Sequence, residues 1–184
     1  ALLHQVWPDA TPAELKTVGR QSWGRTAGGF GYVHLRDVPD DLPRQLDEIL
    51  QGIGDVPGLV LDLRANGGGG CDHDAVFGRL LPAGTTWKQY TGQGARPYPG
   101  RVVVIVDAGV RSAGETVAGM LKEGGRAFLI GPEPTAGSSS QKETVAVPSG
   151  KLEVRVSVVT HGRESNDGRG IEGIGVSPHE VVPY

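Results

Sequence analysis

Residues 101–124 read RVVVIVDAGVRSAGETVAGMLKEG, and this stretch sets the expected fold. Its apolar run, Val102 to Val106, holds four valines among five residues. β-branched side chains favour strands, and a run that is apolar on both faces favours a parallel strand covered on both sides. From Ala113 to Leu121 the apolar residues recur at helical spacing. The stretch therefore predicts a strand, a turn and a helix, with Ser112 where the turn becomes the helix.

Ser112 permits two interpretations. With Glu115 three residues later it matches a capping box, in which the serine hydroxyl bonds a backbone N–H of the first helical turn. Alternatively, Ser112 is a nucleophile held at the positive end of a helix, close to N–H groups that would stabilise an oxyanion. This stretch alone leaves both open.

The segment upstream predicts a βαβ unit, which should be right-handed. Residues 30–35 alternate in the manner of a strand, and His34 within it is expected to be structural. Residues 42–53 carry one apolar helical stripe, and residues 58–63, GLVLDL, form a second buried strand.

The loop RANGGGG, residues 64–70, follows this second strand. It lacks the Gly-Lys-Ser/Thr of a phosphate loop, and the dinucleotide spacing would require a glycine at Asp72. Either the loop is a plain flexible turn, or its backbone N–H groups approach an anion closely. Because ordering four glycines costs conformational entropy, we favour a loop that binds a transient anion.

The remaining segments carry weaker signals. Residues 1–29 are interpreted as a lead-in segment or as the end of a preceding domain, and residues 30–184 as the core domain. We further expect a short helix at 12–18, a helix at 71–81, a strand at 85–90, a strand at 127–130, a hairpin of 144–147 with 152–159, and a last strand at 181–182.

Bulk properties narrow the function. A chain of 184 residues suits one domain with a real core. A net charge of −3 does not indicate a basic surface for binding nucleic acid. No apolar run approaches the roughly 20 residues of a membrane span. Cys71 is the one cysteine, so no internal disulfide can form. No metal or cofactor is predicted, and the sequence does not fix the compartment.

Three segments together resemble the core of the C-terminal-processing (tail-specific) serine protease family. They are GLVLDLRANGGG, VVVIVDAGVRSAGETVAGML with GRAFLIG, and GRGIEGIGVSPHEVV. The chain is most similar to the branch that contains the tricorn protease core and the interphotoreceptor retinoid-binding protein. The resemblance implies an α/β fold, a ClpP/crotonase-like spiral with a mainly parallel core sheet and flanking helices.

The resemblance also assigns roles to residues. Ser112 falls on the family's nucleophile, and one oxyanion-hole N–H would come from Gly68 or Gly69. The other would come from Ala113. Glu172, in the context GIEGIGV, matches the glutamate of the tricorn-like branch.

The general base is the point of departure from the family. The tail-specific branch uses a lysine about 25 residues after the serine, but that neighbourhood reads TAGSSS, and Lys142 lies beyond it. The tricorn-like branch takes a histidine from a segment upstream of the core. His4 precedes the core and His73 follows the glycine loop, so both are candidates, and a histidine outside this chain is the third alternative. We therefore expect weak or no activity from this chain by itself.

These observations predict a serine endopeptidase core that acts on extended peptides or unfolded proteins. Its partners include a possible preceding helical domain, and oligomers are possible. A non-proteolytic binding module for an apolar ligand or peptide is the alternative. Crotonase-type acyl-thioester chemistry is a third possibility, against which the Ser-Ala-Gly-Glu helix start argues.

Overall fold

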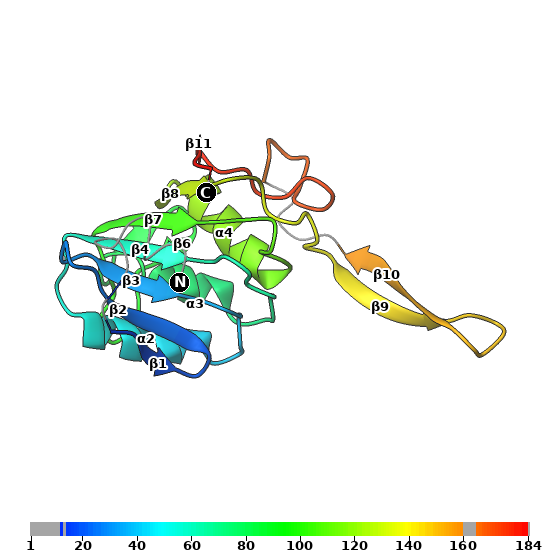
Figure 1. The fold of residues 1–184 in the computed structure, drawn as a ribbon, viewed down its shortest axis with the longest axis horizontal. Helices are drawn as coiled ribbons and strands as arrows, with labels where there is room; N and C mark the ends of the chain where they lie inside the picture. The colour runs from blue at the N-terminus through cyan, green and yellow to red at the C-terminus, as the bar shows by residue number, and fades with distance from the viewer. Residues whose placement is uncertain (1–11, 13, 160–164, 184) are drawn as a thin grey trace.

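A seven-stranded sheet forms the body of the protein, and a two-stranded hairpin projects from it (Figure 1). The computed structural model describes residues 12, 14–159 and 165–183. The elements of this part of the chain are β1 (Lys16–Val18), β2 (Gln21–Arg25), β3 (Gly31–His34), α2 (Leu42–Ile53), β4 (Gly58–Asp62), α3 (His73–Gly78), β5 (Thr86–Trp87), β6 (Tyr90–Thr91), β7 (Arg101–Ile105), α4 (Ala113–Glu123), β8 (Ala127–Gly131), β9 (Gln141–Ala146), β10 (Glu153–Val159) and β11 (Glu180–Val181).

The sheet has the order β1-β2-β3-β4-β7-β8-β11. Strands β3, β4, β7, β8 and β11 pair in parallel, whereas β1 and β2 add to the β3 edge as an antiparallel extension. The expected mixed α/β architecture with a mainly parallel sheet is therefore confirmed. Because parallel strands end at one edge, the loops that follow β4 and β7 meet there.

The core lies between the sheet and the helices. Leu59 and Leu61 of β4 and Val102 and Val104 of β7 belong to one buried cluster with the apolar stripes of α2, α3 and α4. The alternate residues are less covered, and Phe128 of β8 is 47% exposed. The described residues thus cover one face of the sheet fully and the other in part, whereas the valine run predicted cover on both faces.

Helix α2 begins and ends where the sequence signals place it. Pro43 occupies its first turn, where a missing N–H costs nothing, and Gly54 ends it with a φ of +67°. One face, formed by Leu42, Leu46, Ile49, Leu50 and Ile53, is buried. This stripe anchors the crossover between β3 and β4.

Two local predictions were wrong. Residues 16–18, expected to be helical, form strand β1, because pairing with β2 in the sheet overrides local propensity. The expected strand at 85–90 is instead a small hairpin of β5 and β6, which turns at Lys88 with a φ of +53°. The described part of the lead-in is continuous with the sheet, and the domain boundary at residue 30 stays a prediction.

The hairpin of β9 and β10 confirms the expected one, and it extends well beyond the body (Figure 1). Its strands carry exposed apolar side chains, because Val145, Val154 and Val156 are each at least 44% exposed. Its base lies beside the start of α4, so it forms one wall of the site described next.

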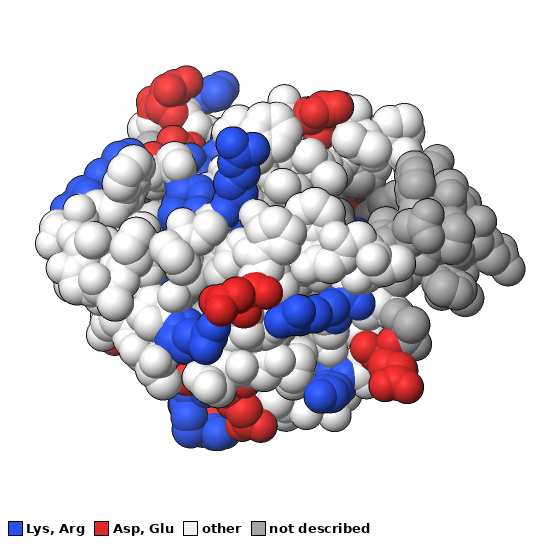
Figure 2. Space-filling view, turned by 90° about the vertical axis from the view of Figure 1, so that its left-hand side faces the viewer, with Lys and Arg blue, Asp and Glu red and all other residues white. Residues whose placement is uncertain are grey.

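Basic and acidic side chains alternate over the face of the body shown in Figure 2, without a broad field of one sign. Among the described helices, none is long and apolar enough to cross a bilayer. The described residues also contain no cluster of three or more His, Cys, Asp or Glu side chains suited to a metal ion.

Candidate active site

Ser112 has a strained backbone at the start of α4. Its φ is +52° and its ψ is −126°, a conformation that non-glycine residues rarely adopt. Such strain persists only where the surroundings enforce it, and it concentrates at functional sites. A nucleophile on a sharp turn between a strand and a helix has its hydroxyl raised above the sheet edge. Ser112 follows β7 and precedes α4, so it occupies this kind of position.

The buried carboxylate of Glu115 holds this turn in place. Its Oε2 accepts the N–H groups of Ser112 at 3.1 Å and Ser138 at 2.8 Å. Its Oε1 accepts the Thr135 hydroxyl at 2.6 Å and the Gly137 N–H at 2.7 Å. The glutamate half of the capping box is thus present, and the same side chain also fixes the segment after β8. Ser112 N–H is shared with the Ser138 carbonyl, at 3.0 Å.

The glycine loop packs directly against Ser112. Gly68 has a φ of +88°, and a Cβ added there would lie 2.6 Å from Ser112 Cβ. Gly69 has a φ of +141°, and its Cβ would lie 2.1 Å from the Val38 carbonyl oxygen. Glycine is therefore required at both positions, for conformation and for space. Asn66, fully buried, donates to the Leu35 carbonyl at 2.8 Å and so fixes the start of the loop.

The loop's N–H groups are not equivalent. Gly67 N–H donates to the Arg36 carbonyl, Gly68 N–H to Asn66 Oδ1 at 2.9 Å, and Gly70 N–H to the Val38 carbonyl at 2.7 Å. No described residue accepts a hydrogen bond from Gly69 N–H. Ala113, the first residue of α4, likewise has an N–H without an acceptor among the described residues, as expected at a helix start.

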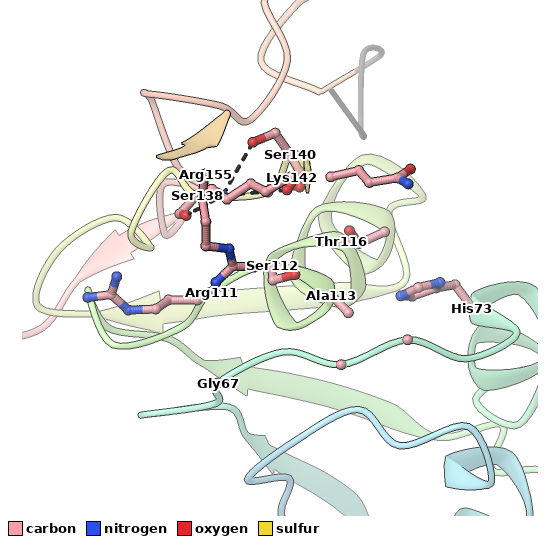
Figure 3. A pocket seen from close by; sticks show the side chains of 14 residues that line it. Gly67, His73, Arg111, Ser112, Ala113, Thr116, Ser138, Ser140, Lys142 and Arg155 are labelled. Atoms are coloured by element: carbon pink, nitrogen blue, oxygen red, sulfur yellow. Dashed lines mark hydrogen bonds between the residues drawn. The ribbon is translucent and has the colours of Figure 1, made fainter. Parts of the chain in front are cut away.

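A cleft of about 700 Å³ opens over these groups (Figure 3). Its lining comes from the glycine loop, the start of α3, the start of α4, the segment after β8 and the hairpin. These residues are Gly67, Gly69, Gly70, His73, Arg111, Ser112, Ala113, Thr116, Ser138, Ser139, Ser140, Gln141, Lys142 and Arg155. The cleft is lined mainly by glycine, hydroxyl and cationic groups, which suits a polar chain better than an apolar ligand.

His73 is the described histidine that lines the cleft. It is the first residue of α3, and its imidazole points toward the start of α4 (Figure 3). His34 lies elsewhere, with its Nε2 3.0 Å from the Arg64 carbonyl oxygen, in agreement with a structural role. His179 accepts the Leu129 N–H at 2.9 Å. His4 lies outside the described residues.

Glu172 lies at the hairpin side of the cleft. Its Oε2 accepts the Ser140 N–H at 2.8 Å, and its Oε1 accepts the Ser157 hydroxyl at 3.4 Å. Burial raises the pKa of this carboxyl, but the hydrogen bonds from Ser140 and the charge of Lys142 outweigh it and lower the pKa. No described imidazole bonds to Glu172, so its role as the third polar member stays a prediction.

The sequence interpretation set Lys142 aside because it lies beyond the loop, and it missed Arg155, but both line the cleft. Lys142 Nζ donates to the hydroxyls of Ser138 at 3.1 Å and Ser140 at 3.3 Å. Arg155, on the paired strand, lies with its guanidinium beside Ser112 in Figure 3. Period-2 alternation in β9 and β10 could have identified the polar face that carries both, but not the direction in which it points.

Comparison with known proteins agrees with this geometry. Residues 29–182 match the family model described as peptidase family S41. The chain belongs to peptidase family S41. It is 28% identical to a carboxyl-terminal-processing protease of Synechocystis, over 86% of this chain and 39% of that relative. The chain thus spans about two-fifths of the length of this relative.

Solved structures of the same fold include both branches expected from the sequence. This S41 chain is 26% identical to the photosystem II D1 C-terminal processing protease, with a TM-score of 0.61, over 91% of this chain and 50% of that one. It is 20% identical to the tricorn protease, with a TM-score of 0.64, over 85% of this chain and 15% of that one. The expected family is confirmed, and these likenesses agree with the expected ClpP/crotonase-like fold.

Proposed function

We propose that this S41 chain is the catalytic core of a serine endopeptidase in which Ser112 is the nucleophile. The observation that carries the proposal is the strained Ser112 turn, which opens onto the cleft beside two backbone N–H groups that lack acceptors among the described residues. Ser112 Oγ would form a bond to the scissile carbonyl carbon and give its proton to a base. The base then protonates the leaving amine as the C–N bond breaks, and water releases the acyl group.

The oxyanion would be held by the N–H groups of Gly69 and Ala113. Of the two glycines predicted from the sequence, Gly68 already donates its N–H to Asn66, whereas Gly69 does not donate to any described residue. Gly68 would instead allow the loop backbone to approach Ser112 closely. Each donor of this kind contributes about 3 kcal/mol to the barrier reduction.

We propose that the general base is an imidazole, with His73 and His4 as the two candidates. His73 lines the cleft, and Glu172, which accepts the Ser140 N–H, would orient the base or complete the relay. A histidine base gives activity that rises near pH 6.5. Because Lys142 also lines the cleft, variants identify the residue: casein cleavage should be lost in His73→Gln or in His4→Gln and kept in Lys142→Gln. Loss of cleavage in Lys142→Gln alone would refute an imidazole base.

The proposed substrate is an extended peptide or unfolded protein, which would add as a strand beside the site. The relative's name, a carboxyl-terminal-processing protease, supports substrates cut near their C-terminus. A preceding helical domain and oligomer formation remain part of the proposal.

Turnover of unfolded casein tests this function. The chain should cleave it slowly, Ser112→Ala should not, and Ser149→Ala, a change in the exposed hairpin turn, should match the wild type. Casein cleavage that persists in Ser112→Ala would refute the assignment. A chain that binds a lipid-like ligand and cleaves nothing would favour the binding module instead.

A further inference from the structure

The cleft carries an excess of positive charge. Arg111, Lys142 and Arg155 line it, from the turn before α4, from β9 and from β10 respectively. None of the fourteen lining residues is acidic, although the chain as a whole has a net charge of −3. The three cations are far apart in sequence, so the fold itself gathers them around Ser112.

Two of these cations are not neutralised. Arg111 and Arg155 are exposed and form no ion pair with any described residue. Elsewhere, Arg64 and Arg79 are paired with Asp62 at 2.5 Å and Asp47 at 2.8 Å. Asp107 and Glu115, the acidic residues nearest to Arg111 in the chain, accept backbone N–H groups instead. Glu153 shares a strand face with Arg155 without an ion pair, and Glu172 is hydrogen-bonded to Ser140 and lies near Lys142.

The chemistry of a guanidinium defines what it would bind. Its planar set of donors matches a carboxylate with two parallel hydrogen bonds, and it stays charged over the working pH range. In Figure 3 the guanidinium of Arg155 lies beside Ser112, whereas the side chain of Arg111 extends away from Ser112 toward the edge of the cleft. Lys142 is held by Ser138 and Ser140, so it adds to the positive field while its amino group is already partly satisfied.

We propose that Arg155 binds a substrate carboxylate next to the scissile bond, and that Arg111 and Lys142 strengthen the field that attracts it. This inference rests on the proposed peptidase function and names its substrate class: peptides that present a carboxylate within a residue or two of the cleavage point. The carboxylate comes from an Asp or Glu side chain or from the free C-terminus. Because each source places the charge differently, peptides can separate them.

Four quenched fluorescent peptides of one parent sequence provide the test. One carries Glu beside the cleavage point and an amidated C-terminus, and its partner carries Gln there. The other two lack the acidic side chain and end two residues after the cleavage point, one as a free acid and one as an amide. Wild-type kcat/KM should be about tenfold higher for the acid of at least one pair, in line with a charge-assisted hydrogen bond, and salt should reduce that ratio.

Variants assign the effect to the cleft. Arg155→Gln should reduce the acid-to-amide ratio several-fold, mainly through KM, and Arg111→Gln should reduce it less, because that change removes only part of the positive field. The matched control is Arg101→Gln, an exposed arginine at the start of β7 that does not line this cleft, and it should keep the wild-type ratio. Ratios near one for both peptide pairs would overturn this proposal, while Ser112-dependent cleavage would leave the peptidase assignment standing.

Binding provides a readout that does not need turnover. Fluorescence anisotropy of the same peptides on Ser112→Ala should show tighter binding of the acid form, and Arg155→Gln in that background should remove the difference. Equal affinities for acid and amide would refute carboxylate recognition even if no peptide is hydrolysed.

Discussion

Glu115→Gln should destabilise the protein markedly, because Glu115 is a fully buried carboxylate that accepts four hydrogen bonds. Each of its oxygens accepts two donors: Oε1 from Thr135 and Gly137, and Oε2 from Ser112 and Ser138. Glutamine keeps the size but offers one acceptor oxygen, so its NH₂ group must face two donors whichever way it is placed.

Ser112 N–H keeps the Ser138 carbonyl as an acceptor and the Thr135 hydroxyl can rotate, so in either orientation one backbone donor, Ser138 N–H or Gly137 N–H, loses its acceptor. A buried donor left without an acceptor costs about 1–3 kcal/mol, so we expect a loss of about 2 kcal/mol in the free energy of unfolding. For a chain of this size that lowers Tm by roughly 6 °C. Because Ser112 N–H is one of the four donors, reactivity of the serine should fall as well.

Urea unfolding followed by circular dichroism measures the effect, with Glu48→Gln as the matched control. Glu48 lies on the exposed surface of α2, where its 3.7 Å contact with Arg44 is a weak surface pair, so its loss should cost less than about 0.5 kcal/mol. If Glu115→Gln unfolds within 1 kcal/mol of the wild type, the carboxylate does not hold the turn and this reasoning is refuted.

Three further predictions concern the glycine loop, acid stability and the cysteine. Gly68→Ala should lower the rate of Ser112-dependent hydrolysis by more than tenfold, because the added methyl group would clash with Ser112 Cβ. Gly70→Ala is the control, since its methyl group would meet nothing within 4 Å. Equal hydrolysis rates for the two variants would argue against close packing of the loop on Ser112. Burial raises the pKa of Asp62, but the hydrogen bonds and charge of Arg64 and the bond from Tyr32 at 2.7 Å lower it overall. The ionised carboxylate therefore stabilises the fold above its unfolded pKa of about 3.9, and this contribution is lost in more acidic solution. Urea unfolding should therefore show Asp62→Asn less stable than the wild type at pH 7, with a gap that narrows toward pH 3; a gap that does not depend on pH would contradict this. Burial, with the charges of Asp72 and Asp40, raises the pKa of the Cys71 thiol to about 11. Iodoacetamide at pH 8 should therefore modify Cys71 much more slowly in the folded protein than in the urea-unfolded protein. Equal rates of modification would contradict the raised pKa.

Much of the fold follows from local patterns. The valine run became β7, the stripe from Leu42 to Ile53 became α2, and the hairpin formed around its expected turn at residues 148–150. These signals are strong because side-chain periodicity records which face is buried. The family resemblance rested on three such segments, and the match over residues 29–182 confirms it.

Other features depend on contacts between distant segments, which a pattern does not contain. Residues 16–18 gave no strand signal, because their pairing with β2 comes from the sheet rather than from their own sequence. The sequence identified Glu115 as half of a capping box. Its bonds to Thr135 and Gly137 could not be predicted, because they depend on the path of the chain after β8. Arg155 reaches the cleft only because the hairpin folds beside α4.

Tyr90 and Tyr98 are further residues whose role their sequence context leaves open. Loop aromatics in turn-rich sequence could wall a cleft or pack into the core, and both are buried, at 6% and 7% exposure. Tyr90 stacks on Phe77 of α3, with ring centroids 3.9 Å apart. For Tyr90, packing against α3 decides between the two, whereas the Tyr98 hydroxyl donates to the Val56 carbonyl at 3.2 Å.

Covalent labelling with a fluorophosphonate probe, followed by intact mass measurement and peptide mapping, tests the central claim most directly. The chain should gain one adduct, on Ser112, and Ser112→Ala should gain none, while Ser149→Ala labels as the wild type does. An adduct on another serine, or no adduct on a chain that still cleaves casein, would contradict the assignment of Ser112 as the nucleophile.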